Sequence, residues 1–251
     1  MLQEYVKKTI ENHIATIEFF YPEHNALPRS ILTNLAHTIT AVGHNSDVKV
    51  VVLKSGGNKT FCAGASFQEL ININDAAAGK DFFLGFAQVI NAMRKCPKFI
   101  IGRVQGKAVG GGVGIVAATD YCLATKFAAV KYSELSIGIG PFVVAPAIER
   151  KIGLAAFSQM ALDAHLFYEA SWAKEKGLFA QVFDDIDQMD IALQHLAQQL
   201  CTYSPEAMQE MKKMFWTGTE HWDELLIERA TISGKLVISK FSQKALDSYK
   251  Y

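Results

Sequence analysis

The sequence QGKAVGGGVG, residues 105–114, holds three consecutive glycines between two apolar runs, 99–104 and 115–118. The first run has the length and composition of a buried strand, and the second is typical of a short helix. Glycines at such a junction expose backbone N–H groups at the start of the helix, near the positive end of its dipole. This suits an anion, or an oxyanion that develops on a carbonyl group. A tight turn with positive φ angles would require the same glycines.

A second glycine-bearing loop occurs earlier, in the sequence FCAGAS at residues 61–66. It follows a strand-like run at 50–53 and the turn SGGN at 55–58. Its small side chains would let a ligand approach the main chain, and Ala65 would offer its N–H group. Two such loops, each following an apolar strand, supply the two donors of an oxyanion hole if they meet in space.

The order of these and other motifs resembles the crotonase (enoyl-CoA hydratase/isomerase) family. The resemblance extends from about residue 14 to residue 177, with a weaker tail. It rests on NAL at 25–27, DVKVVVL at 47–53, the glycine loops at 61–65 and 106–112, SEL at 133–135 followed by Gly138, and Ala170, Ala173 and Gly177-Leu178. It implies an α/β, crotonase-like fold with a repeated ββα spiral core. It also implies coenzyme A thioesters as substrates, and an enolate held by the N–H groups of Ala65 and Gly111.

The resemblance also indicates the acid/base residues. Hydratases of the family use two glutamates that flank one water molecule; Gly114 stands at the first of these positions and Glu134 at the second. With one carboxylate, moving a proton is easier than adding water, since Glu134 could take a proton from C2 or C4 and return it at the other carbon. The apolar sequence PFVV at 141–144 would desolvate Glu134 and raise its pKa. We therefore predict a double-bond isomerase with Glu134, Ala65 and Gly111 as catalytic groups.

Substrate contacts are predicted for Ala63, Gly64, Ser66, Gly110 and Phe142. Coenzyme A would enter as part of the substrate, and neither a metal nor a separate cofactor is expected. Two alternatives remain: an enoyl-CoA hydratase with an atypical second acid/base group, and a non-catalytic protein that binds CoA thioesters.

A nucleotide-dependent oxidoreductase is less well supported. The sequence GVGIVA at 112–117 fits the loose dinucleotide fingerprint G-x-G-x-x-G/A. That fingerprint also expects an acidic residue about 20 positions later. Asp120 comes too early and Glu134 fits only marginally.

Composition narrows the remaining classes. Half of the 251 residues are hydrophobic, and 25 basic residues balance 25 acidic ones, so no electrostatic footprint for nucleic acid or a membrane surface exists. The four cysteines are scattered without CxxC spacing, which favours reduced thiols and no zinc site. The first residues lack the apolar core of a signal peptide, and no run approaches the ~18 apolar residues of a spanning helix. We expect a cytoplasmic protein.

Two regions differ in their predicted secondary structure. Up to residue 186, strands at 15–19, 50–53, 99–104, 121–124 and 130–132 alternate with helices. Residues 189–201, 205–216 and 222–238 are predicted helices, the second with Ser204 as its N-cap and Pro205 at its first position. We predict a spiral core with the acyl-CoA site at 1–186 and a helical region at 187–251. The resemblance implies that this region joins subunits into a homotrimer or homohexamer; packing on its own core is the alternative.

Overall fold

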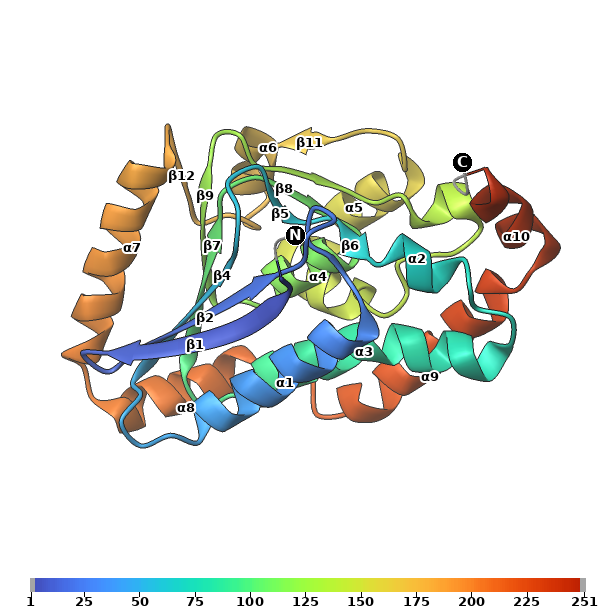
Figure 1. The fold of residues 1–251 in the computed structure, drawn as a ribbon. Coiled ribbons are helices and arrows are strands. Elements are labelled where there is room, and N and C mark those ends of the chain that lie inside the picture. Colours follow the sequence, from blue (N-terminus) through green and yellow to red (C-terminus); the bar gives the residue numbers. More distant parts are fainter. Residues whose placement is uncertain (1–2, 249–251) are drawn as a thin grey trace.

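The computed structural model describes residues 3–248, so the ends of both predicted regions, residues 1–2 and 249–251, lie outside the described residues. Its largest sheet has six strands in the order β1-β2-β4-β7-β9-β12 (Figure 1). β1 and β2 form an antiparallel pair, and all the later neighbours are parallel. The six strands are β1 (Tyr5–Glu11), β2 (Ile14–Phe20), β4 (Val50–Ser55), β7 (Phe99–Val104), β9 (Tyr121–Thr125) and β12 (Gln181–Phe183).

A second sheet runs in the order β11-β10-β8-β5, and β3 pairs with β6. These strands are β11 (Tyr168–Glu169), β10 (Ala129–Lys131), β8 (Lys107–Val109), β5 (Thr60–Cys62), β3 (Ala26–Leu27) and β6 (Gly64–Ala65). Three successive units place one strand in the large sheet, the next in the small sheet, and later a helix: β4-β5-α3, β7-β8-α4 and β9-β10-α5. In the first unit, β6 and α2 come between β5 and α3. The predicted repeated ββα spiral is therefore confirmed.

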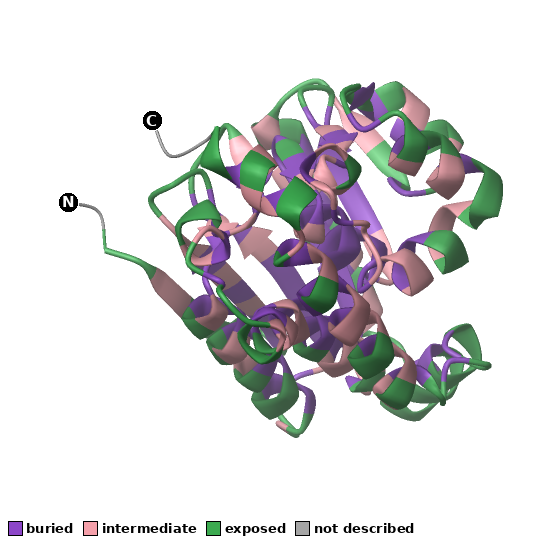
Figure 2. Cartoon of the chain, turned by 90° about the vertical axis from the view of Figure 1, so that its right-hand side faces the viewer, coloured by how far each residue is buried: buried purple, intermediate pink, exposed green. Residues whose placement is uncertain are grey.

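The helices of the core follow the apolar spacing of the sequence. α1 (Arg29–Gly43) buries Ile31, Leu35, Ile39 and Val42, which recur at helical intervals. The other core elements are α2 (Phe67–Leu70), α3 (Ala76–Lys95), α4 (Gly111–Ala117), the 3₁₀ turn η1 (Glu134–Ile137) and α5 (Ala145–Leu162). Asp75 caps α3 by accepting hydrogen bonds from the N–H groups of Ala77 and Ala78. Figure 2 shows buried residues on the interior strands and exposed residues on the outer turns of the helices.

Helices dominate the C-terminal part of the chain, as predicted. They are α7 (Ile186–Cys201), α8 (Pro205–Phe215), α9 (Trp222–Val237) and α10 (Lys240–Asp247), whereas α6 (Ala170–Glu175) precedes them in the part predicted as core. Ser204 caps α8, and Pro205 is its first residue. α7 covers one face of the large sheet, where its Met189 and Leu193 pack with Val50 and Ile101 of the strands. α9 lies along α3 beneath the sheets in Figure 1.

The C-terminal helices α9 and α10 also pack against α2 and η1 of the core. Val237 of α9 and Leu246 of α10 pack with Leu70, Ile137 and Ile139 in one apolar cluster. The helical region therefore adds surface beside η1, although the division into 1–186 and 187–251 stays a prediction. Among residues 3–248, no helix combines the length and apolar character that crossing a membrane requires.

Candidate active site

The two glycine loops meet in space. Gly64 has a φ of +92°, and a Cβ atom on it would lie 3.0 Å from the Val109 carbonyl oxygen and 3.7 Å from the Gly111 nitrogen. A Cβ atom on Gly112 would lie 2.6 Å from the Cys62 carbonyl oxygen. Side chains at these positions would force the loops apart, so the glycines permit the close approach. Gly111 is the first residue of α4, and its N–H group therefore has no carbonyl partner within that helix.

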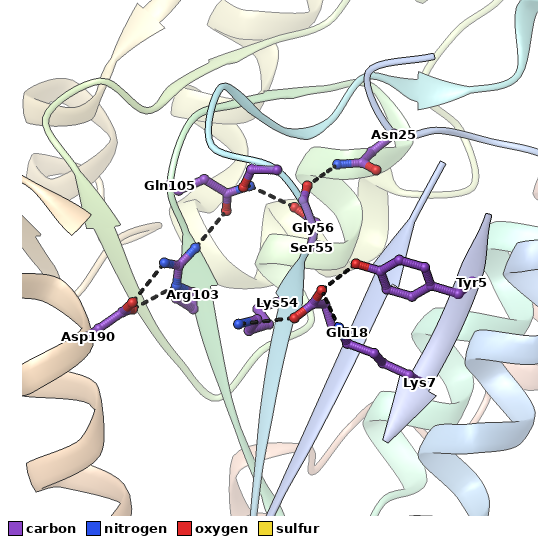
Figure 3. Close-up of polar contacts among 11 residues, drawn as sticks. Tyr5, Lys7, Glu18, Asn25, Lys54, Ser55, Gly56, Arg103, Gln105 and Asp190 are labelled. Carbon is purple, nitrogen blue, oxygen red and sulfur yellow. Dashed lines mark hydrogen bonds and ion pairs between the residues drawn. The ribbon is translucent and has the colours of Figure 1, made fainter. Parts of the chain in front are cut away.

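A polar network fixes the turn that precedes the first loop (Figure 3). Asn25 donates from Nδ2 to the carbonyl oxygens of Gly56 and Thr60, at 3.0 and 3.1 Å. Buried Gln105 donates from Nε2 to Ser55 Oγ at 2.9 Å and to the same Thr60 oxygen at 3.1 Å. The first residue of the glycine-rich stretch thus holds the strand end that leads into residues 61–66.

Glu134 begins η1, directly after the strand β10 and the two residues that follow it. Its Oε2 atom accepts a hydrogen bond from the Ser133 N–H group at 2.9 Å. Its Oε1 atom would lie 2.6 Å from a Cβ atom on Gly110, whose φ is +51°. Glycine at 110 therefore gives the carboxyl group its place beside the second loop.

Burial changes the acidity of this carboxyl group. Although Glu134 as a whole is half-buried, desolvation raises its pKa from 4.5 to about 7, against the lowering effect of hydrogen bonds from backbone N–H groups. Among residues 3–248, no side chain forms an ion pair with it. The predicted rise in the pKa of Glu134 is confirmed. A group with this pKa can both accept and donate a proton near neutral pH.

The two glycine loops and Glu134 line one small cavity of about 70 Å³. Seven of the eight residues predicted for the site line it: Ala63, Gly64, Ala65, Gly110, Gly111, Glu134 and Phe142. The eighth predicted residue, Ser66, does not line it. Ser66 is buried beneath the loop and caps α2, where its Oγ accepts a hydrogen bond from the Glu69 N–H group at 3.4 Å.

Most of the remaining wall of the cavity, which is apolar apart from Ser233, was not predicted from the sequence. Phe67 and Leu70 come from α2, Phe83 and Phe86 from α3, and Ser233 from α9. The buried residues of α3, among them Phe82, Phe86 and Met93, recur at helical spacing, but that spacing gives no signal of what the buried face contacts. Cys62 lies under the first loop, where burial raises the pKa of its thiol to about 12 and disfavours the nucleophilic thiolate.

Gly114 stands where the sequence resemblance places the first glutamate of the family's hydratases, and the side chain of Val144 occupies the space beside it. A Cβ atom on Gly114 would lie 2.4 Å from Cγ1 and 2.6 Å from Cβ of Val144, the residue that precedes α5. Val144 itself lines the cavity. The chain thus combines a glycine on α4 with a bulky side chain facing it, and a larger residue at 114 alone would clash.

The chain and its spiral fold have known relatives. The family model for enoyl-CoA hydratase/isomerase matches residues 9–250. The peroxisomal Delta(3,5)-Delta(2,4)-dienoyl-CoA isomerase of Arabidopsis thaliana is 28% identical, over 86% of this chain and 82% of its own. The short-chain-enoyl-CoA hydratase of Clostridium acetobutylicum is 27% identical, over 84% and 80%.

A solved structure supports the same fold. The enoyl-CoA hydratase from Bacillus halodurans superposes with a TM-score of 0.90 over 97% of this chain and 99% of its own, at 19% identity. The chain belongs to the enoyl-CoA hydratase/isomerase family, and it has the crotonase fold.

Proposed function

We propose that this protein is an enoyl-CoA isomerase that moves a carbon–carbon double bond along the acyl chain of a thioester. One observation carries the proposal: a single carboxylate, Glu134, lies beside the two joined glycine loops and has a pKa of about 7. Such a group can remove a proton from a carbon acid and return it within one catalytic cycle.

The chemistry balances with Glu134 alone. The ionised carboxylate takes a proton from C2 of a 3-enoyl thioester, and the electron pair moves onto the thioester oxygen to give a dienolate. The N–H groups of Ala65 and Gly111 would donate hydrogen bonds to that oxygen as its charge develops. Glu134 then returns the proton at C4, so the double bond shifts to C2–C3 and no atom is gained or lost.

Hydration makes a further demand, because a water molecule must be deprotonated while a proton is added at C2. Gly114 carries no side chain that could replace the other glutamate of the family's hydratases. Val144 occupies the space next to it, so a carboxylate would not fit there. The names of the relatives leave both reactions open, since the Arabidopsis protein is called an isomerase and the Clostridium protein a hydratase. The pair Gly114 and Val144 favours the isomerase.

Product partition tests the proposal. The purified protein is incubated with 3-enoyl-CoA and, separately, with 2-enoyl-CoA, and the formation of conjugated enoyl-CoA and of 3-hydroxyacyl-CoA is followed by chromatography. We expect isomerisation of the 3-enoyl substrate and little hydration of the 2-enoyl substrate. Rapid hydration without isomerisation would establish the hydratase alternative, and binding without turnover of either would establish the non-catalytic one.

Assembly and compartment are separate proposals. Leu154 and Leu162 of α5 and Met214 of α8 are large apolar side chains that are 62%, 77% and 62% exposed. Exposed apolar surface is typical of subunit interfaces, so we propose a homotrimer or homohexamer, which light scattering on the purified protein would measure. A cytoplasmic location also stays a proposal, since the Arabidopsis relative is named as peroxisomal.

A further inference from the structure

Two cavities of very different size share one wall. The catalytic cavity measures about 70 Å³, and the other about 750 Å³. Gly140, Pro141 and Phe142 line both. Because Glu134 lines only the smaller cavity, the shared segment separates the reacting groups from a much larger space.

The aromatic ring of Phe142 provides most of the bulk in this wall. A Cβ atom on Gly140 would lie 2.6 Å from Cζ and 2.7 Å from Cε2 of Phe142, so the ring folds back over the main chain of residue 140. Any side chain at 140 would displace the ring. Glycine at 140 and phenylalanine at 142 thus form a matched pair.

The larger cavity lies between α5 and the start of α9. Apolar side chains from both helices line it, among them Phe157, Ala161, Trp222 and Leu225. Charged residues, including Glu149 and Arg150, lie at its exposed rim. Its interior could therefore receive an alkyl chain, and Phe142 lines both this cavity and the one that Glu134 lines.

We infer that Phe142 ends the acyl pocket and restricts this enzyme to thioesters with short acyl groups. The inference rests on the proposed function, because it takes an acyl-CoA thioester as the ligand of the catalytic cavity. Each methylene that enters an apolar pocket strengthens binding about fourfold, the equivalent of about 0.8 kcal/mol. That gain stops where the chain meets the ring. Without the ring, a longer chain would continue into the larger cavity.

Binding of saturated acyl-CoA esters from four to twelve carbons, measured by calorimetry, tests the inference without depending on which reaction the enzyme catalyses. For the wild type we expect affinity to level off or fall after the first few carbons. For Phe142→Ala we expect affinity to keep rising, with a gain of about tenfold or more for the longest chains relative to butyryl-CoA.

Two further variants distinguish a wall from a general loss of packing. Phe142→Ala combined with Ala161→Phe refills part of the larger cavity, so the preference for short chains should return. Gln159→Ala changes an exposed polar residue of α5 outside both cavities and should reproduce the wild-type profile.

Three results would overturn the inference. An affinity that rises steadily to twelve carbons in the wild type would show that no wall exists, and an identical profile in Phe142→Ala would show that the ring is not the wall. Absence of binding at every chain length would remove the proposed function together with the inference. Binding with a length profile that does not respond to Phe142 would remove the inference alone.

Discussion

Asp120 and Glu134 are two acidic side chains that the fold withdraws from water in different ways. The Asp120 carboxylate accepts hydrogen bonds from Lys212 Nζ at 2.6 Å, Trp216 Nε1 at 3.1 Å and the Ile100 N–H group at 2.7 Å. The side chains of Asp120 and Lys212 are only 5% and 2% exposed. Glu134, in contrast, lines an apolar cavity without an ion-pair partner in the described part of the chain.

The difference separates a carboxylate with a structural role from the proposed catalytic base. Asp120 directly precedes strand β9, and its pairing with Lys212 connects that strand to α8. Lys212 also compensates the negative charge of Asp120. Glu134 has no such compensation, so its charged form is disfavoured and its pKa rises to about 7. A catalytic base must accept and release a proton near neutral pH, and the raised pKa of Glu134 fits that requirement.

Glu134→Gln should give the largest effect. The amide keeps the shape of the side chain and an acceptor for the Ser133 N–H group, but it is no longer a base. Isomerase turnover should fall by about 10²–10⁴, the usual contribution of general acid–base catalysis. Glu175→Gln, which changes a side chain that is 70% exposed, is the matched control and should retain full turnover. Steady-state kinetics with 3-enoyl-CoA check this, and a Gln variant that stays fully active would exclude Glu134 as the base.

Lys212→Met should reverse that pattern, with lost stability and retained catalysis. Removing the cation leaves the Asp120 carboxylate buried without its main partner, which costs about 3–5 kcal/mol of unfolding free energy. Turnover per folded molecule should stay unchanged, because Lys212 does not line the catalytic cavity.

Denaturant unfolding measures the stability of this variant. Adding Asp120→Asn should recover part of the loss, since no unpaired charge then remains buried. If Lys212→Met were as stable as the wild type, the ion pair would not be what holds α8 to β9.

The pH dependence of stability gives a smaller effect of predictable sign. Folded Glu134 keeps its proton up to about pH 7, whereas in the unfolded chain it ionises near its ordinary pKa of 4.5. Unfolding therefore releases a proton between these values, and the free energy of unfolding should fall as pH rises through that window, by at most about 3 kcal/mol.

Glu134→Gln removes this contribution and serves as the reference for other titrating groups. The stability of the wild type relative to the variant should decline between pH 4.5 and about pH 7, while isomerase kcat/KM rises as the base ionises. A constant difference in stability over that range would mean that the pKa of Glu134 is not raised.

The sequence predicted what local patterns determine. Glycine runs after apolar strands indicated both loops, and the order of the motifs indicated the spiral and the position of Glu134. Helices α7 to α9 were predicted from long stretches with few strand signals and, for α8, from the cap at Ser204. Each of these features depends on residues close together in the chain, where steric and hydrogen-bonding rules act directly.

Contacts between distant segments were not predictable in the same way. The wall of the cavity takes Phe67 from α2, Phe86 from α3 and Ser233 from α9, and no short pattern in the sequence announces that these residues meet. Ser66 was predicted to contact substrate from its place in the loop, but its hydroxyl caps α2 beneath the cavity. Local geometry, the start of a helix, decides where that side chain points.

Placing a second carboxylate beside Glu134 should give the smallest effect. It tests the contrast with Asp120 by giving Glu134 a charged neighbour. Gly114→Glu alone should misfold or lose activity, because its Cβ atom would lie 2.4 Å from Val144 Cγ1 and 2.6 Å from Val144 Cβ. Val144→Ala would leave that second clash in place, so the companion change must be Val144→Gly. Glycine is acceptable there because Val144 is the N-cap of α5.

In Gly114→Glu/Val144→Gly, the new glutamate side chain enters the space that Val144 occupied, at the wall of the cavity that Glu134 lines. A like charge nearby should raise the pKa of Glu134 further, so isomerisation should slow at neutral pH. Slow hydration of 2-enoyl-CoA should appear at the same time, because one carboxylate can now activate water while the other serves the α-carbon. The single variant Val144→Gly is the control and should not hydrate. If Val144→Gly hydrates as fast as the double variant, the wild-type site lacks space rather than a second carboxylate. The contrast between paired Asp120 and unpaired Glu134 would then not explain why the enzyme isomerises instead of hydrating.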